Sequence, residues 1–89
     1  MKDRRKDIVD FEIVDPDTQM KYVISVNIRK YREEKGLTQT ELGEKFGKAK
    51  TTVASWEGGK SLPDAELLYR IARFLGRSIE DMYHLKKVD

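Results

Sequence analysis

The residues whose types and spacing could do chemistry lie close together near the middle of the chain. Four polar residues fall outside the apolar face of a short helix predicted over about 50–58: Lys50, Thr51, Thr52 and Ser55. The apolar face is supplied by Val53 and Trp56. Short hydroxyl side chains let a helix backbone approach DNA closely, and a lysine reaches guanine acceptors or phosphates. The pattern therefore predicts a helix that reads the major groove of double-stranded DNA. Spacing alone leaves open a five-helix bundle whose third helix faces water.

A second helix is predicted directly before the first, over about 38–46. Thr38 and Glu41 have the T-x-x-E spacing of a capping box, and Leu37 and Leu42 are placed for the hydrophobic staple around it. Gly47 ends this helix and begins a tight turn over 47–49. Two short helices joined by such a turn, the second with a polar outer side, are typical of a helix-turn-helix.

Three further helices must position this pair. One is predicted from residue 25 to Gly36, one from Asp64 to Gly76, and one from Ser78, where Asp81 completes another capping pattern. The helix after Asp64 carries the widest apolar stripe, which should form the main wall of the core: Leu67, Leu68, Ile71, Ala72 and Leu75. The expected fold is mainly α, a five-helix DNA-binding domain over 25–89.

The first 24 residues are predicted to form an extension to that domain. Residues 1–7 are expected to be a flexible basic arm, and 8–24 a β-hairpin. The hairpin prediction rests on two apolar alternations around the turn residues 15–18, namely Val9, Phe11, Ile13 and then Met20, Tyr22, Ile24. An isolated hairpin is marginal in water, so its apolar face should pack on the helical body or on a second subunit.

Composition excludes several classes of function. The chain has 89 residues, enough for one core and too few for a separate sensing or catalytic domain. It has no cysteine and a single histidine, His84, which removes disulfides, thiol nucleophiles and Cys/His zinc sites. No nucleophile–base pair or carboxylate constellation is discernible, so we expect neither an enzyme nor a cofactor or metal. Without a membrane-length apolar run or a signal core, the chain is expected to be cytoplasmic.

The positive charge lies in the middle of the chain. Residues 1–24 carry a net charge of −1, residues 25–60 carry +3, and residues 61–89 are neutral. An excess of basic side chains around the predicted helix-turn-helix is consistent with a surface that meets phosphates.

Several motifs in register resemble the lambda-repressor/Cro-like helix-turn-helix family, also called the XRE family. The resemblance covers roughly residues 25–85 and rests on the run Ile28–Gln39, then Leu42, Phe46-Gly47, Trp56-Glu57-x-Gly59 and Leu62-Pro-Asp64. It implies a bacterial or phage-type transcriptional regulator, most simply a repressor that occludes promoter DNA. It also implies a homodimer on half-sites about 34 Å apart.

The resemblance assigns roles residue by residue. Gln39 is expected to brace both a phosphate and the recognition helix. Lys50, Thr51 and Ser55 match base-reading positions. Thr52, Lys60 and Thr38 match contacts to the DNA backbone. Arg32 and Glu57 match a pair that clips the first helix to the end of the recognition helix, and this pair is expected to be scaffold rather than contact.

The chain departs from the family pattern at four positions. Lys48 and Ala49 stand where an apolar residue and a hydroxyl N-cap are common, so the recognition helix lacks a side-chain cap. Ser55 is shorter than the usual residue, and Arg77 replaces an apolar one.

The acidic, strand-like extension motivates an alternative function, an antitoxin or other protein-binding module that holds a partner through the hairpin and binds DNA for autoregulation.

Overall fold

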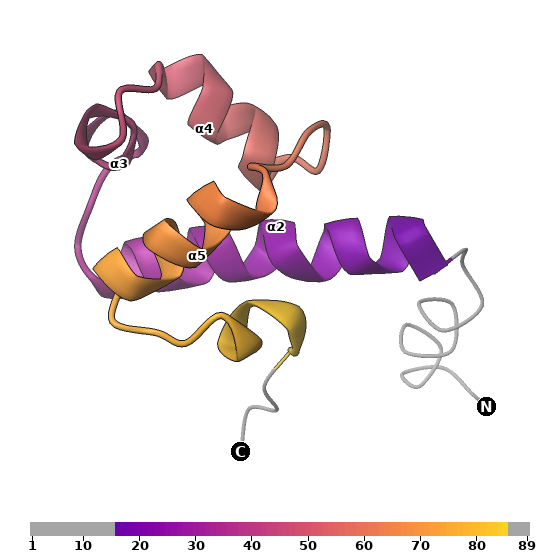
Figure 1. Cartoon of the computed structure of the whole chain (residues 1–89). Coiled ribbons are helices and arrows are strands. Elements are labelled where there is room, and N and C mark those ends of the chain that lie inside the picture. The colour runs from indigo at the N-terminus through magenta and orange to yellow at the C-terminus, as the bar shows by residue number, and fades with distance from the viewer. Residues whose placement is uncertain (1–15, 86–89) are drawn as a thin grey trace, which may run out of the picture.

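The computed structural model describes residues 16–85, which form four α-helices and one 3-10 turn. The helices are α2 (Pro16–Glu34), α3 (Gln39–Lys45), α4 (Lys50–Glu57) and α5 (Ala65–Phe74), and the turn is η1 (Glu80–Tyr83). In Figure 1, α2 runs across the molecule, with α3 and α4 above it, η1 below it and α5 overlapping it in this view. The mainly α fold is confirmed, with one helix fewer than expected.

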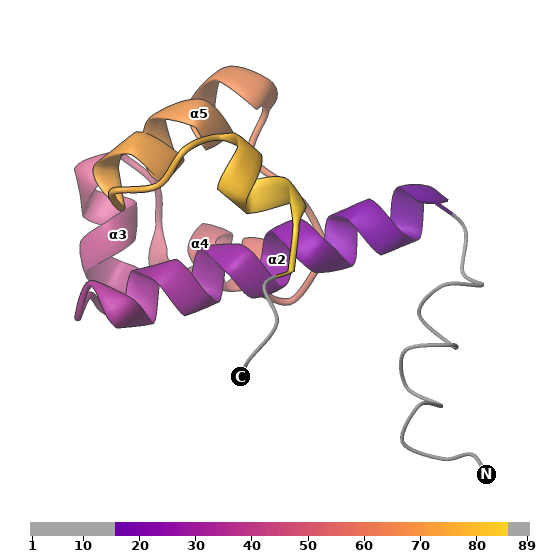
Figure 2. The ribbon, with the colours of Figure 1, turned by 90° about the horizontal axis from the view of Figure 1, so that it is seen from below.

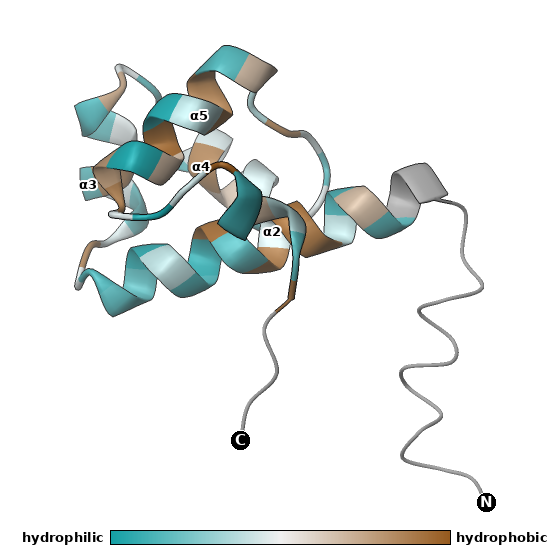
Figure 3. Cartoon of the chain, turned by 60° about the horizontal axis from the view of Figure 1, so that its bottom comes forward, coloured by the Kyte–Doolittle hydropathy of each residue, from teal (hydrophilic) through white to brown (hydrophobic). Residues whose placement is uncertain are grey.

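The core lies where α2, α4 and α5 face one another. Its fully buried side chains come from each of these elements and from α3 and η1: Ile28, Tyr31, Leu42, Val53, Ile71 and Met82. Figure 3 shows hydrophobic residues in the middle of α2 and along α5, and hydrophilic ones toward the C-terminal end of α2. The helices that carry the predicted DNA-reading residues thus pack against the same hydrophobic core.

The predicted second strand of the hairpin is wrong, because residues 16–24 form the first half of α2. Val23 and Ile24 are buried, while Met20 and Tyr22 are 42% and 51% exposed. Burial continues at helical spacing through the rest of α2. The alternation of apolar residues at 20, 22 and 24 therefore resembled a strand pattern only by chance. Proline suits the first turn of a helix as well as a β-turn, so Pro16 was an ambiguous signal. The predicted arm and first strand lie outside the described residues.

The predicted last helix is shortened to the single turn η1. Ser78 and Asp81 do form reciprocal cap hydrogen bonds, at 3.1 and 3.0 Å. The buried Asn27 amide of α2 then donates to the carbonyl oxygens of Asp81, Met82 and His84 at 2.9–3.2 Å. These carbonyls accept from the Asn27 side chain, so they do not need the backbone amides of a further helical turn. The chain can therefore leave the helix, and His84 has an extended backbone. Figure 2 shows η1 lying beside α2.

Arg77 is one of the departures from the family pattern, where an apolar residue is expected. Its side chain covers part of the core instead of extending into solvent. Its guanidinium lies 4.3 Å from the Tyr31 ring centroid and pairs with Glu34 at 2.7 Å. The Tyr31 hydroxyl is buried without a hydrogen-bond partner among the described residues, and this burial raises the pKa of Tyr31. The guanidinium, which lies over the Tyr31 ring, thus takes the place of the expected apolar side chain.

Candidate nucleic-acid interface

The start of α3 is fixed by the capping box expected from the sequence. Thr38 accepts a hydrogen bond from the Glu41 amide at 3.0 Å, and the Glu41 carboxylate accepts one from the Thr38 amide at 2.9 Å. Leu37, just before the cap, packs against the core that contains Leu42. Thr38 is exposed and Gln39 half-buried, so both side chains stand at a helix end whose amides favour negative charge.

A short turn joins α3 to α4 by close backbone contact. The Lys48 amide donates to the Gly43 carbonyl at 2.8 Å. A Cβ built on Gly43 would collide with the Lys48 carbonyl oxygen, and it would also lie 3.3 Å from a Val53 methyl carbon. Glycine at 43 is therefore what lets the turn approach α3 so closely.

The outer side of α4 is polar and open at its N-terminal end. Lys50 and Thr51 are exposed and Thr52 and Ser55 are half-buried, whereas Val53 and Trp56 are no more than 3% exposed. Ala49 is the N-cap and makes no side-chain cap hydrogen bond, as its missing hydroxyl requires. The first turn of α4 consequently presents free backbone amides beside its polar side chains.

The C-terminal end of α4 is held by a buried ion pair. Arg32 of α2 binds the Glu57 carboxylate through two nitrogens, at 2.6 and 3.0 Å, with side chains 9% and 4% exposed. Arg32 also donates to the Leu37 carbonyl at 2.6 Å. The hydrogen bond to Glu57 raises the pKa of Arg32 against the opposing effect of burial. The guanidinium stays charged and links α2, the α2–α3 loop and α4.

Gln39 joins this network from α3. Its amide nitrogen donates to Glu57 at 3.0 Å, which leaves the amide oxygen and one N–H for another partner. The structure thus brings Arg32, Gln39 and Glu57 into one hydrogen-bonded unit that fixes α3 and α4 relative to α2.

The loop after α4 folds back on Ser55. The Ser55 carbonyl accepts from the amides of Lys60 and Ser61, at 3.0 and 3.4 Å, and the two serine hydroxyls are 2.8 Å apart. Ser61 was missed by the sequence reasoning. The available signal was a second hydroxyl residue just past the Gly58-Gly59 helix stop, which is where a returning loop meets the last turn.

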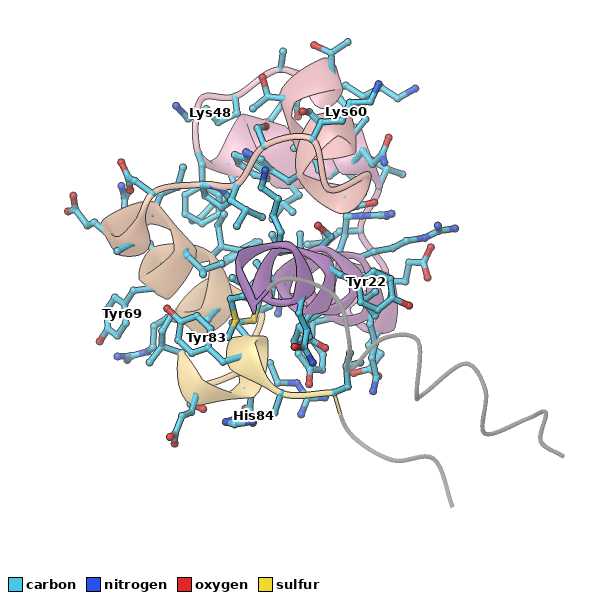
Figure 4. All side chains as sticks on the ribbon, turned by 90° about the vertical axis from the view of Figure 1, so that its right-hand side faces the viewer. Tyr22, Lys48, Lys60, Tyr69, Tyr83 and His84 are labelled. Atoms are coloured by element: carbon cyan, nitrogen blue, oxygen red, sulfur yellow. The ribbon has the colours of Figure 1, made fainter. Side chains whose placement is uncertain are left out.

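Unpaired lysines surround α4. Figure 4 shows Lys48 and Lys60 on the same side of the molecule, whereas Tyr69, Tyr83 and His84 lie elsewhere. Lys48, Lys50 and Lys60 are exposed and form no ion pair within residues 16–85. This side of the described structure combines free cations, short hydroxyl side chains and exposed helix starts, a set suited to phosphates and base edges.

Two other kinds of site find no support in the described part of the chain. Residues 16–85 hold no group of three or more His, Cys, Asp or Glu side chains placed to bind a metal ion. Among the same residues, no helix combines the length and apolar character needed to cross a membrane.

Comparison with known proteins identifies the same domain. A family model described as helix-turn-helix matches residues 28–82. An HTH-type transcriptional regulator of Methanothermobacter thermautotrophicus is 48% identical over 59 residues, covering 65% of this chain and 86% of the relative. An HTH-type transcriptional regulator of Archaeoglobus fulgidus is 41% identical, covering 63% of this chain and 80% of its own. Both are archaeal, so the expected bacterial source gains no support.

Similar solved structures include both a regulator and an enzyme. The clp gene regulator ClgR of Corynebacterium glutamicum matches with a TM-score of 0.66 and 27% identity, over 71% of this chain and 67% of ClgR. Hydroxypropylphosphonic acid epoxidase of S. wedmorenis matches with a TM-score of 0.67 and 28% identity, over 73% of this chain. The match spans 35% of the epoxidase chain. A likeness to about a third of an enzyme is a likeness of one domain and carries no activity with it.

Proposed function

The chain belongs to the helix-turn-helix family of the XRE, Cro and C1 type, and we propose that it is a transcriptional regulator that binds double-stranded DNA sequence-specifically. The helix-turn-helix is a DNA-binding domain. The observation that carries the proposal is the open polar start of α4, with Lys50 and Thr51 exposed on a helix whose other end is clamped by Arg32 and Gln39.

In the proposed complex, α4 enters the major groove. Lys50, Thr51 and Ser55 contact base edges there. Three exposed or half-buried side chains around them contact the DNA backbone: Thr38, Thr52 and Lys60. Gln39 donates one N–H to Glu57 and uses the other on a phosphate, so that DNA binding and helix placement share one side chain.

We propose repression by promoter occlusion, with a homodimer as the binding species. A domain of this size covers promoter DNA without needing contacts to other proteins. Two copies related by a two-fold axis would present their α4 helices to half-sites about 34 Å apart. Moving the half-sites apart by about half a helical turn places them on opposite faces of the duplex, and dimer binding should then weaken. Binding that ignores this spacing would show that single copies bind independently.

We do not propose the antitoxin function. It was motivated by a strand-like extension, and residues 16–24 of that extension are instead part of α2.

The test is selection of duplexes from a random library, followed by anisotropy measurements on the selected sequence. The chain should enrich a motif, and log affinity should fall with log salt by about 0.9 per phosphate contact. A Lys50→Ala, Thr51→Ala double variant should lose about 100-fold in affinity for the motif, because each base contact contributes about 1–3 kcal/mol.

Arg29→Ala is the matched control. Arg29 is an exposed cation on α2, paired with Glu33 at 3.1 Å, and has no proposed DNA contact. Its removal should leave the selected motif unchanged. Failure to enrich any motif, or equal losses in the double variant and the control, would overturn the proposed function.

A further inference from the structure

Ser55 and Ser61 form a hydroxyl pair at the edge of the proposed DNA interface. Their oxygens are 2.8 Å apart and either one can be the donor. Ser55 lies on α4, and Ser61 is exposed in the loop beyond it. Ser55 is a proposed base contact, while Ser61 has no role in the proposed function.

The loop backbone holds Ser61 in this place. The Ser55 carbonyl accepts from the amides of Lys60 and Ser61, and Gly59 turns the chain with a φ of +76°, which side chains other than glycine rarely adopt. A Cβ on Gly59 would also lie 3.5 Å from the Ser25 hydroxyl of α2. The two hydroxyls therefore meet because of the fold of the loop, and Lys60, the proposed phosphate contact, is the neighbour of Ser61.

The hydroxyl pair has one proton more than its own hydrogen bond uses. Two hydroxyls carry two protons, and their mutual hydrogen bond uses one of them. A phosphate oxygen can accept a hydrogen bond but cannot donate one. If Ser61 binds a phosphate beside Lys60, its proton goes to that phosphate, and the mutual bond must use the proton of Ser55. Ser55 then has lone pairs and no proton to offer the bases.

We propose that Ser61 is a specificity-determining residue, which donates to a DNA phosphate and accepts from Ser55, so that Ser55 meets the bases as an acceptor. In the major groove, the donors that match an acceptor are the exocyclic amines of adenine and cytosine. Ser61 thereby selects an amine at the position that Ser55 reads. This inference rests on the proposed function and deepens it.

The experiment uses the full chain on its selected duplex and locates the position at which Ser55→Ala relaxes the base preference. At that position, a base analogue without the exocyclic amine should weaken wild-type binding about fivefold, the effect of one hydrogen bond. Where that base is adenine, 7-deazaadenine, which lacks the N7 acceptor but keeps the exocyclic amine, should bind as before. In Ser61→Ala, the proton of Ser55 is released from the pair, and the preference for the amine should fall about fivefold.

Two further variants separate specificity from structure. Ser61→Thr keeps the hydroxyl and should keep the preference. The double variant Ser55→Ala, Ser61→Ala should be no less selective than Ser55→Ala alone, because the two hydroxyls act as one unit. A purely structural role, or a phosphate contact alone, would lower the affinity of Ser61→Ala for all duplexes equally and leave the preference ratio unchanged.

The outcomes that overturn the inference are distinct from those that overturn the proposed function. A wild-type chain that enriches no motif removes both. A clear motif that Ser55→Ala does not relax, a preference that Ser61→Ala leaves intact, or a position sensitive to N7 and not to the amine removes this inference and leaves the DNA-binding proposal standing.

Discussion

The two ends of α4 are built in opposite ways. At the C-terminal end, the Glu57 side chain is 4% exposed, and its carboxylate accepts hydrogen bonds from Arg32 and Gln39. At the N-terminal end, Ala49 provides no side-chain cap, and Lys50 and Thr51 face solvent. The C-terminal end is bound to α2 and α3 through side-chain hydrogen bonds. The N-terminal end keeps backbone amides without a side-chain cap.

In the proposed complex, this difference would separate scaffold from DNA-reading surface within the eight residues of α4. A buried, paired charge fixes a direction in space but cannot take part in binding without losing its partner. Free amides and exposed side chains at a helix start remain available for an anionic ligand. We propose that the clamped end fixes the direction of α4 and that the open end makes its contacts with DNA.

Breaking the clamped end should have the largest effect. In Glu57→Ala, the Arg32 guanidinium stays buried without its carboxylate, and the free energy of unfolding should fall by about 3–5 kcal/mol, as for other buried pairs that lose one partner. Urea unfolding followed by circular dichroism measures this.

The matched control for that variant is Glu33→Ala. Glu33 approaches the same Arg32 at 3.7 Å, but its side chain is 53% exposed, so its loss should cost no more than about 1 kcal/mol. Equal costs for the two variants would mean that the Glu57 pair does not clamp α4. Glu57→Gln, which keeps an acceptor oxygen, should fall between them.

The turn between the two helices should be the next most sensitive point. Gly43→Ala would gain about 1 kcal/mol of helix propensity, but the new methyl group meets the backbone carbonyl of Lys48, which cannot rotate away. Overpacking of this kind costs about 1–3 kcal/mol, so the net change should be destabilising. Glu44→Ala, on the exposed side of α3, is the control. A Gly43→Ala variant more stable than wild type would show that the turn can move away from α3.

The parts of the fold that could be predicted from sequence are those set by local signals. Thr38 with Glu41 indicated the start of α3, and Asp64 indicated the start of α5. Ala49 indicated that α4 has no side-chain cap. Each of these features depends on residues within about one helical turn, so the sequence contains all the information needed. α3 spans Gln39–Lys45 and α4 spans Lys50–Glu57, beside predicted ranges of about 38–46 and 50–58.

The parts that could not be predicted depend on contacts between distant residues. The length of η1 is limited by Asn27, whose amide reaches carbonyls 54 to 57 residues away. The first half of α2 was predicted as a strand because Met20, Tyr22 and Ile24 alternate. The pair Val23 and Ile24, adjacent and both buried, was the signal against a strand with one buried face. Ser61 was missed because its hydroxyl and its place after the Gly58-Gly59 stop do not by themselves show that the loop returns onto Ser55.

Capping the open end should have the smallest effect and the most informative one. Ala49→Ser places a hydroxyl at the N-cap, where φ and ψ are already −75° and 157°, the extended geometry that a cap residue adopts. The free energy of unfolding should rise by about 1 kcal/mol, measured as before. The new hydroxyl would also occupy an amide in the first turn of α4. If that amide contacts a phosphate in the complex, the more stable variant should bind its selected duplex more weakly. If stability and affinity rise together, the amides at the open end do not contact DNA, and the contrast between the two ends concerns folding alone.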